Sequence, residues 1–463
     1  MPLIIPANTL SAASYDVANS CRFNRPDSPY MHITPGGDGD LKIFTVSFWV
    51  KRGNLNGGTS GTDREVIFSN ATNDQISFHN DDLCFLEDGS DRAITNMKFR
   101  DFSAWYHIVM AFDTNQSTDT NRHKVYVNGV QIDQSTGFST MTYVAEDLEM
   151  GFGKGSEMMS VGRSEFDDNR HFNGYLSEFY YINGTMLDHT SFGEFDSDSP
   201  TIWKPKKFSG SFGTNGFYLD FEDSANLGND ANGGTDLTEV NLAAADQATD
   251  TPTNNFAVLN PLIEHFPTYV TTYSEGNLDA TRSDTGSGLS TIMVTSGKWY
   301  AEFKLITLGS GKSVIGAVSY DLTAGVVSSG GENSSSNSGV CYRSDGKKRI
   351  DGGTAATYGD SFVANDIISI ALNLDDGECT FYKNGTAQAS GTALSGFSTA
   401  SAFAIDCKGG GSTWKWSANF GNPSPSYTIS SGNADANGYG NFEYSVPTNY
   451  YALCTKNLAE FGG

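Results

Sequence analysis

Short runs of β-branched and aromatic residues recur along the chain and end at turn residues, and this pattern most constrains the fold. The run Trp105–Phe112 is apolar at nearly every position, which predicts a central strand covered on both faces. Asn128-Gly129, between two further runs, predicts a tight hairpin turn. Helical pieces are expected only near Thr190–Gly193 and Leu242–Asp246. The sequence therefore predicts an all-β protein built from β-sandwiches.

The residue composition changes between residues 206 and 264, where stretches rich in turn residues alternate with short apolar segments. A chain of 463 residues is long enough for more than one domain. We expect two jelly-roll or β-sandwich domains, over residues 1–205 and 265–463. We expect an ordered, loop-rich linker over residues 206–264 to join them.

Acidic residues outnumber basic ones by 54 to 29, which gives a formal net charge of −25. Nucleic acids and anionic membranes attract the opposite sign, so neither is an expected partner. The sequence has no apolar run long enough to span a membrane, and its start lacks the pattern of a secretion signal. The six cysteines are widely spaced, so we expect free, buried thiols in a protein made in a reducing cytoplasm.

Five segments of the first half share the pattern of one sandwich family. In chain order they are Phe44–Arg52, Trp105–Phe112, Tyr126–Gly129, Val161–Arg163 and Phe172–Phe179. Together they resemble the laminin-G-like (concanavalin A-like) domains, over roughly residues 15–205. The resemblance implies a jelly roll whose rim residues often bind calcium. The corresponding candidates here are Asp113, Asp167 and Asp168, although no dense loop of oxygen ligands is found. No other cofactor is expected, and calcium stays open.

Three segments of the second half share the pattern of another family: Gly297–Phe303, Asn365–Gly385 and Ser417–Gly421. They resemble the SPRY domains, over roughly residues 265–425. In that family, loops at one end of the sandwich usually bind the ligand. The candidate ligand-binding residues are a basic, aromatic-tipped hairpin and one indole: Tyr342, Arg343, Lys347, Lys348 and Trp414. A solvated turn and a core tryptophan are the alternatives.

The beginning of the chain (Met1–Asn24), the joint (Asp250–Phe256) and the end (Tyr451–Leu458) resemble structural proteins of marine and cyanobacterial tailed phages. The resemblance implies a tail or head fibre or spike on the virion exterior that binds a host cell-surface glycan or receptor. A structural decoration protein of the capsid or tail is the rival interpretation. A polysaccharide depolymerase is the third.

Enzymatic activity is not expected, because each catalytic pattern is incomplete. Asp284-Thr-Gly286 occurs once, whereas an aspartic protease needs two facing carboxylates. Glycoside hydrolysis also needs opposed acids, but Glu165-Phe-Asp167 is followed by Arg170, and Glu194-Phe-Asp196 by Ser199. His107 lies inside a strand pattern and is expected to pack in the core.

Three apolar segments are expected to belong to neither sandwich: Leu3–Ile5, Phe217–Leu219 and Phe256–Leu259. Exposed segments of this kind usually mark an interface. Together with the symmetry of phage appendages, they predict a homo-oligomer, and specifically a trimer, that also contacts other virion proteins.

Overall fold

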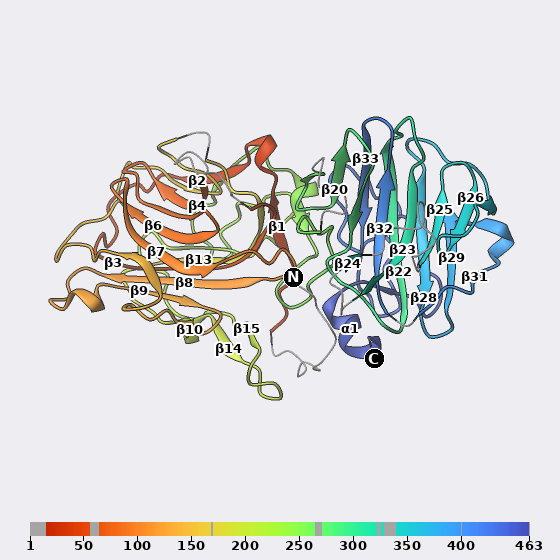
Figure 1. The fold of residues 1–463 in the computed structure, drawn as a ribbon. Helices are drawn as coiled ribbons and strands as arrows, with labels where there is room; N and C mark the ends of the chain where they lie inside the picture. Colours follow the sequence, from red (N-terminus) through yellow and green to blue (C-terminus); the bar gives the residue numbers. More distant parts are fainter. Residues whose placement is uncertain are drawn as a thin grey trace. The chain divides into compact units, whose positions relative to one another are not determined.

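Strands, nearly all of them antiparallel, form most of the regular structure in the computed structural model (Figure 1). The structure describes residues 15–55, 64–167, 170–263, 271–321, 326–327, 339–399 and 401–462. They divide into two compact units, the first ending at Thr253 and the second beginning at Asn254. Within this part of the chain, α1 (Thr455–Phe461) is the one α-helix. The predicted all-β class is confirmed.

The first unit is a sandwich of two sheets with eight described strands each. The first sheet runs, in spatial order, β10 (Val130–Gln131), β9 (His123–Val127), β8 (Tyr106–Asp113), β3 (Ile43–Arg52), β13 (Gly174–Asn183), β1 (Ser20–Phe23) and β18 (Gln247–Ala248), with β16 (Phe217–Leu219) also paired to β13. The second sheet runs β11 (Phe138–Met141), β7 (Ser90–Lys98), β6 (Asp82–Glu87), β5 (Gln75–His79), β4 (Glu65–Asn70), β12 (Met159–Val161), β2 (Tyr30–Ile33) and β17 (Thr238–Val240).

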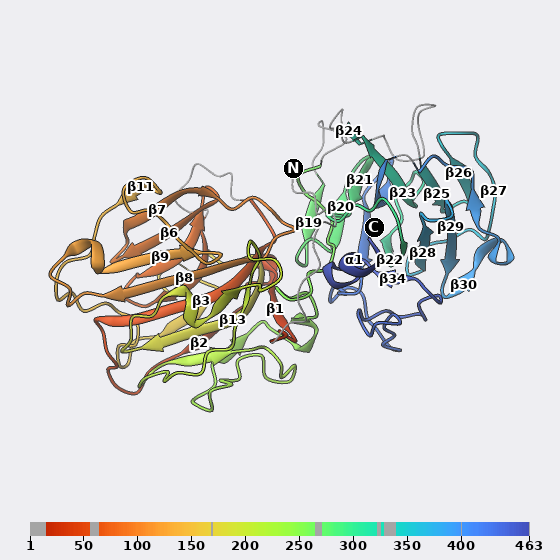
Figure 2. The same cartoon turned by 90° about the horizontal axis from the view of Figure 1, so that it is seen from below.

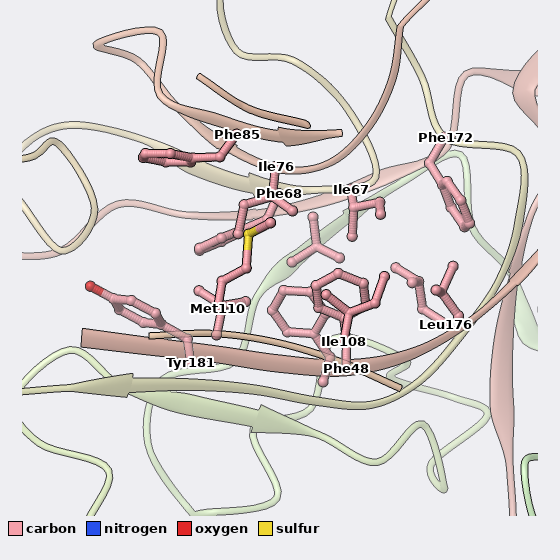
Figure 3. Packing of buried hydrophobic residues seen from close by; sticks show 14 of the residues in the cluster. Phe48, Ile67, Phe68, Ile76, Phe85, Ile108, Met110, Phe172, Leu176 and Tyr181 are labelled. Atoms are coloured by element: carbon pink, nitrogen blue, oxygen red, sulfur yellow. The ribbon is translucent and has the colours of Figure 1, made fainter. Parts of the chain in front are cut away.

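Side chains from the two sheets point toward one another and form the core of the first unit (Figure 3). Phe48 of β3 and Met110 of β8 come from the first sheet, while Phe68 of β4 and Phe85 of β6 come from the second. The alternation of side chains along a strand places these residues on the inner faces. The predicted central strand is confirmed, because β8 lies between β3 and β9. Asn128-Gly129 forms the turn that joins β9 to β10.

The segment 206–253, which we expected to be a linker, contributes strands to both sheets of the first unit. β16 pairs with β13, β17 with β2, and β18 with β1. Asp250 then ties the end of this segment to the sandwich. Its carboxylate accepts hydrogen bonds from Lys51 Nζ at 2.6 Å and from Trp105 Nε1 at 2.9 Å. The boundary between the units therefore lies between Thr253 and Asn254, inside the segment that was expected to be the linker.

A short hairpin covers part of the outer face of the first sheet. It consists of β14 (Gly193–Phe195) and β15 (Trp203–Pro205). Short 3-10 helices lie at Arg25–Asp27, Asp119–Asn121, His189–Ser191 and Ala244–Asp246 in this unit, and at Gln388–Gly391 in the second. Two of them overlap the predicted helical pieces near Thr190 and Ala244.

The second unit also contains two large sheets, seen from below in Figure 2. One runs β19 (Thr272–Ser274), β20 (Asp279–Arg282), β33 (Trp414–Asn419), β22 (Lys298–Thr307), β28 (Ile367–Asn373), β29 (Glu378–Lys383) and β30 (Thr386–Ala387), with β31 (Leu394–Ser395) on β29 and β34 (Tyr451–Ala452) on β22. The other runs β21 (Gly286–Leu289), β32 (Ala402–Gly409), β23 (Val314–Asp321), β25 (Gly339–Arg343), β26 (Lys347–Ile350) and β27 (Ala356–Thr357), with β24 (Val326–Val327) on β23.

Two of the three apolar segments that suggested an interface are buried within their own units. Phe217–Leu219 is β16, and Phe256–Leu259 packs into the cores of the second unit. Leu3–Ile5 lies outside the described residues. All six cysteines are buried and free, as expected. None of the described helices is both long and apolar enough to cross a membrane.

Candidate functional site

β25 and β26 form the predicted basic hairpin, but Tyr342 is not exposed at its tip. Tyr342 lies on β25, and its ring is 0% exposed within the core of the second unit. Its hydroxyl hydrogen-bonds to Gln388 Oε1 at 3.2 Å. Arg343 is also buried and binds the carboxylate of Asp345 through Nε at 3.1 Å. The prediction that Tyr342 contacts a ligand therefore needs correction, because the ring packs inward. Lys347 is exposed and Lys348 half-buried, and a ligand at these two lysines stays a prediction.

Trp414 is likewise part of the core and not of the surface. Its side chain is 0% exposed, and its Nε1 donates a hydrogen bond to the carbonyl oxygen of Asp284 at 2.7 Å. Trp416, two residues along β33, faces the same core. Both indoles lie on one face of β33, and that face is the inner one, so the alternative of a core tryptophan holds for Trp414. Trp414 is therefore unavailable as a stacking platform.

The carboxylates that resembled hydrolase acids are each held by a neighbouring cation. Glu165 accepts two hydrogen bonds from Arg163, at 3.0 and 3.2 Å. Asp167 lies 3.1 Å from Arg170 Nε. Lys204 Nζ lies 3.7 Å from Glu194 and 3.4 Å from Asp196. All four carboxylates are therefore paired with a cation.

His107 is buried as predicted, although it packs against Trp203 of the hairpin and not between the two sheets, and its hydrogen bonds assign its tautomer. Trp203 Nε1 donates to His107 Nδ1 at 2.9 Å, so the ring proton is on Nε2, which donates to Ser47 Oγ at 2.9 Å. Burial lowers the pKa of His107 to about 3. An imidazole that donates to a serine cannot also remove its proton, so this pair does not form an activated nucleophile.

The calcium candidates do not form a common site among the described residues. Asp113 accepts hydrogen bonds from Asn115 N and Gln116 Nε2, and Asp167 is paired with Arg170. Asp168 lies outside the described residues. No three His, Cys, Asp or Glu side chains of the described chain come together in a way that could hold a metal ion.

The first unit has an acidic cleft of about 240 Å³. Its lining includes Asp74, Glu87, Asp88, Glu149 and Lys154. Asp74 is buried and accepts hydrogen bonds from Asn70, Gly151 and the backbone of Asp88. This carboxylate joins three loops, so its role is structural.

A second depression, of about 590 Å³, lies along the edge of the same sandwich. We call it the Tyr143 groove, and it is lined by Thr120, Gln131, Ile132, Asp133, Gln134, Ser135 and Tyr143. β10 and β11, the outermost strands of the two sheets, are consecutive in the chain, and the connection between them forms much of the lining. The volume is in the range of small-ligand sites.

Hydrogen bonds within the groove fix its polar side chains. Gln134 Nε2 donates to the carbonyl oxygens of Thr120 at 3.0 Å and His123 at 2.8 Å. Asp133 Oδ1 accepts from the backbone and hydroxyl groups of Ser135 and Thr136. These bonds lower the pKa of Asp133 to about 2, so its carboxylate is ionised.

Tyr143 provides the aromatic surface of the groove. It is half-buried, and its ring centroid lies 6.1 Å from that of His123. Burial, reinforced by Asp119, raises the pKa of Tyr143, so its hydroxyl keeps its proton. The groove thus combines an aromatic ring with amide, hydroxyl and carboxylate groups, which can stack on and hydrogen-bond to a polar ligand.

No pattern in the sequence predicted this groove. Its lining residues come from a 3-10 helix, a strand edge and two loops, so no short sequence motif contains all of them. The one local signal is Asp133-Gln-Ser-Thr136, whose residue types favour a side-chain-to-backbone turn.

Two family models match the chain, one in each unit. Residues 27–189 match the concanavalin A-like lectin/glucanases superfamily, and residues 298–410 match the SPRY domain. A search of curated proteins finds no match.

Several solved structures are similar in part. The SPRY domain of human HERC1 is 18% identical, with a TM-score of 0.28, over 35% of this chain and 96% of that one. A candidate carbohydrate-binding protein from Bacteroides ovatus ATCC 8483 is 15% identical, with a TM-score of 0.35, over 49% of this chain and 58% of that one. Another human SPRY domain is 15% identical, with a TM-score of 0.22, over 30% of this chain and 90% of that one. By the two family matches, the chain contains a concanavalin A-like domain in its first unit and a SPRY domain in its second.

Proposed function

We propose that the protein is a non-catalytic surface appendage of a tailed phage particle, a tail or head fibre or spike, and that it binds a host cell-surface glycan. The binding site in this proposal is the Tyr143 groove of the concanavalin A-like domain. The lining of the groove is the observation that carries the proposal, because sugars bind to an aromatic face flanked by amides and hydroxyls. The matched superfamily includes lectins, which supports a glycan ligand.

The phage context and the virion location rest on the resemblance of the chain's beginning, joint and end to phage structural proteins. The absence of catalysis is proposed because Glu165, Asp167, Glu194 and Asp196 are all ion-paired. A depolymerase would require two of them to face a substrate in different protonation states. Release of reducing ends from purified host envelope, lost in Glu165→Gln, would favour the enzyme instead.

A homotrimer is proposed as the assembly, on the rotational symmetry of phage fibres and spikes. Phe217–Leu219 and Phe256–Leu259 no longer support it, because both are core segments. Light scattering on the purified chain decides between a trimer and a monomer.

The test of function is binding of the purified, fluorescently labelled protein to host cells. Tyr143→Ala should weaken binding about tenfold by removing the stacking surface. Tyr444→Ala, at a half-buried tyrosine of the second unit, is the matched control and should bind like the unaltered protein. Equal binding by all three proteins would contradict a role for the groove, and absence of cell binding by the unaltered protein would favour the decoration interpretation.

A further inference from the structure

Hydrogen-bond acceptors are prominent in the Tyr143 groove. Gln134 uses its amide nitrogen on two backbone carbonyls, so its Oε1 remains for a ligand; no described residue donates to it. Asp133 uses Oδ1 on its own turn, and its charge is retained because the pKa is about 2. Gln131 is exposed on β10 and adds an amide. Acceptors of this kind favour a ligand that supplies donors.

No positively charged side chain is among the described residues that line the groove. Lys124 follows His123 on β9, and the alternation of side chains along a strand places it on the face opposite to His123. The nearest guanidinium in the chain sequence, that of Arg122, donates to the carbonyl oxygens of Gln116 at 2.8 Å, Val144 at 3.0 Å and Ser117 at 3.2 Å. Its Nη2 also lies 3.3 Å from Glu146 Oε2. The hydrogen bonds and the ion pair of Arg122 are therefore made with neighbouring loop residues.

His123, behind Tyr143, supplies no positive charge either. The imidazole is 0% exposed, and neither ring nitrogen has a hydrogen-bond partner. Burial lowers its pKa to about 4, so the ring is neutral under ordinary conditions. Asp119, which lies close enough to raise the pKa of Tyr143, adds a further negative charge.

From the acceptor-rich lining and the missing cation we infer that the groove selects neutral, hydroxyl-rich glycans and disfavours those that bear carboxylate, sulfate or phosphate. This inference rests on the proposed function and specifies its ligand class. Sugar hydroxyls can donate to Gln134, Gln131 and Asp133, whereas an anionic group only accepts hydrogen bonds and meets the Asp133 carboxylate.

The experiment is a glycan array of neutral microbial oligosaccharides, printed beside the same backbones bearing carboxylate, sulfate or phosphate. The unaltered full chain should bind neutral members, and bind their charged partners about fivefold more weakly at low salt. Asp133→Asn should recover about fivefold for the charged members, since it removes the charge and keeps an oxygen for the turn. Asp236→Asn is the control, because Asp236 is also an exposed acid in a hydrogen-bonded turn of the first unit.

The outcomes separate the two proposals. Preferential binding of charged glycans that is lost in Tyr143→Ala would overturn the inference and leave the groove as the binding site. Binding of any class that Tyr143→Ala leaves unchanged, or no binding on the array, would overturn the groove's function and the inference with it. Equal gains in Asp133→Asn and Asp236→Asn would show that net charge, and not the groove, sets the preference.

Discussion

Two buried histidines of the first unit affect stability differently, because one is hydrogen-bonded and the other is not. His107 is hydrogen-bonded at both ring nitrogens, to Trp203 and Ser47. His123 is hydrogen-bonded at neither and packs against Phe85, Phe112 and Tyr143. A buried polar group without a partner costs about 1–3 kcal/mol, so His123 is a local cost to stability and His107 is not.

The pKa of His123 predicts acid sensitivity. The unfolded chain binds a proton with a pKa near 6.5, and the folded chain only with a pKa of about 4. The unfolded state therefore binds more protons below neutrality, and the stability contributed by a neutral His123 is lost as the pH falls from about 6.5 toward 4. Between pH 7 and 5 the loss is about 2 kcal/mol. In His123→Leu this contribution should vanish, and stability at pH 7 should equal or exceed that of the unaltered protein.

Urea unfolding at pH 7 and pH 5, followed by tryptophan fluorescence, measures the effect. His107→Leu is the contrast: it breaks two buried hydrogen bonds and should destabilise the protein at pH 7 by about 2–4 kcal/mol. An identical fall in stability from pH 7 to 5 in His123→Leu and the unaltered protein would contradict the assignment.

At the residue scale, sequence patterns identify which side chains share a strand face but not which face is covered. Trp414 and Trp416 alternate with Lys415 along one strand and therefore share a face, and both prove to be buried. Tyr342 on β25 is likewise buried, although it was expected to be exposed. The Tyr143 groove could not be predicted, because Thr120, Gln134 and Tyr143 meet only after both sheets have formed.

At the element scale, long strands were predictable because each has a strong local signal. Trp105–Phe112 corresponds to β8 almost residue for residue, and the hairpin at Asn384-Gly385 joins β29 to β30. The seven-residue helix α1 was missed, since a helix this short has little periodic signal. The strands between 206 and 253 were read as a linker for a similar reason: each has only two or three residues.

The strands of segment 206–253 predict where the first unit can be cut. A fragment of residues 1–205 lacks the buried side chains of Phe217, Leu219, Phe221, Leu227 and Leu237. At roughly 2 kcal/mol per side chain, it loses on the order of 10 kcal/mol, comparable with the whole stability of a domain. We expect this fragment to be unfolded or aggregated and a fragment of residues 1–253 to fold.

Circular dichroism and thermal unfolding of the two fragments test this boundary. A cooperative transition in the shorter fragment, at the same temperature as in the longer one, would contradict the integration of these strands. Asp250→Asn in the longer fragment is a finer probe. It removes the carboxylate bound to the buried Lys51 and should cost about 3 kcal/mol.

At the scale of the whole molecule, the two units differ in what they offer a ligand. The concanavalin A-like domain contains the Tyr143 groove at the edge of its sandwich. In the SPRY domain, the candidate aromatic residues are buried, and Lys347 and Lys348 remain as surface candidates. We therefore propose glycan binding for the first unit.

A crystal structure of the full chain with the best-binding neutral glycan tests this assignment most directly. The account predicts a sugar ring against Tyr143, with its hydroxyls within hydrogen-bonding distance of Gln134 and Asp133. A glycan bound to the SPRY domain, or in the acidic cleft at Asp74 and Glu149, with the Tyr143 groove empty, would contradict it.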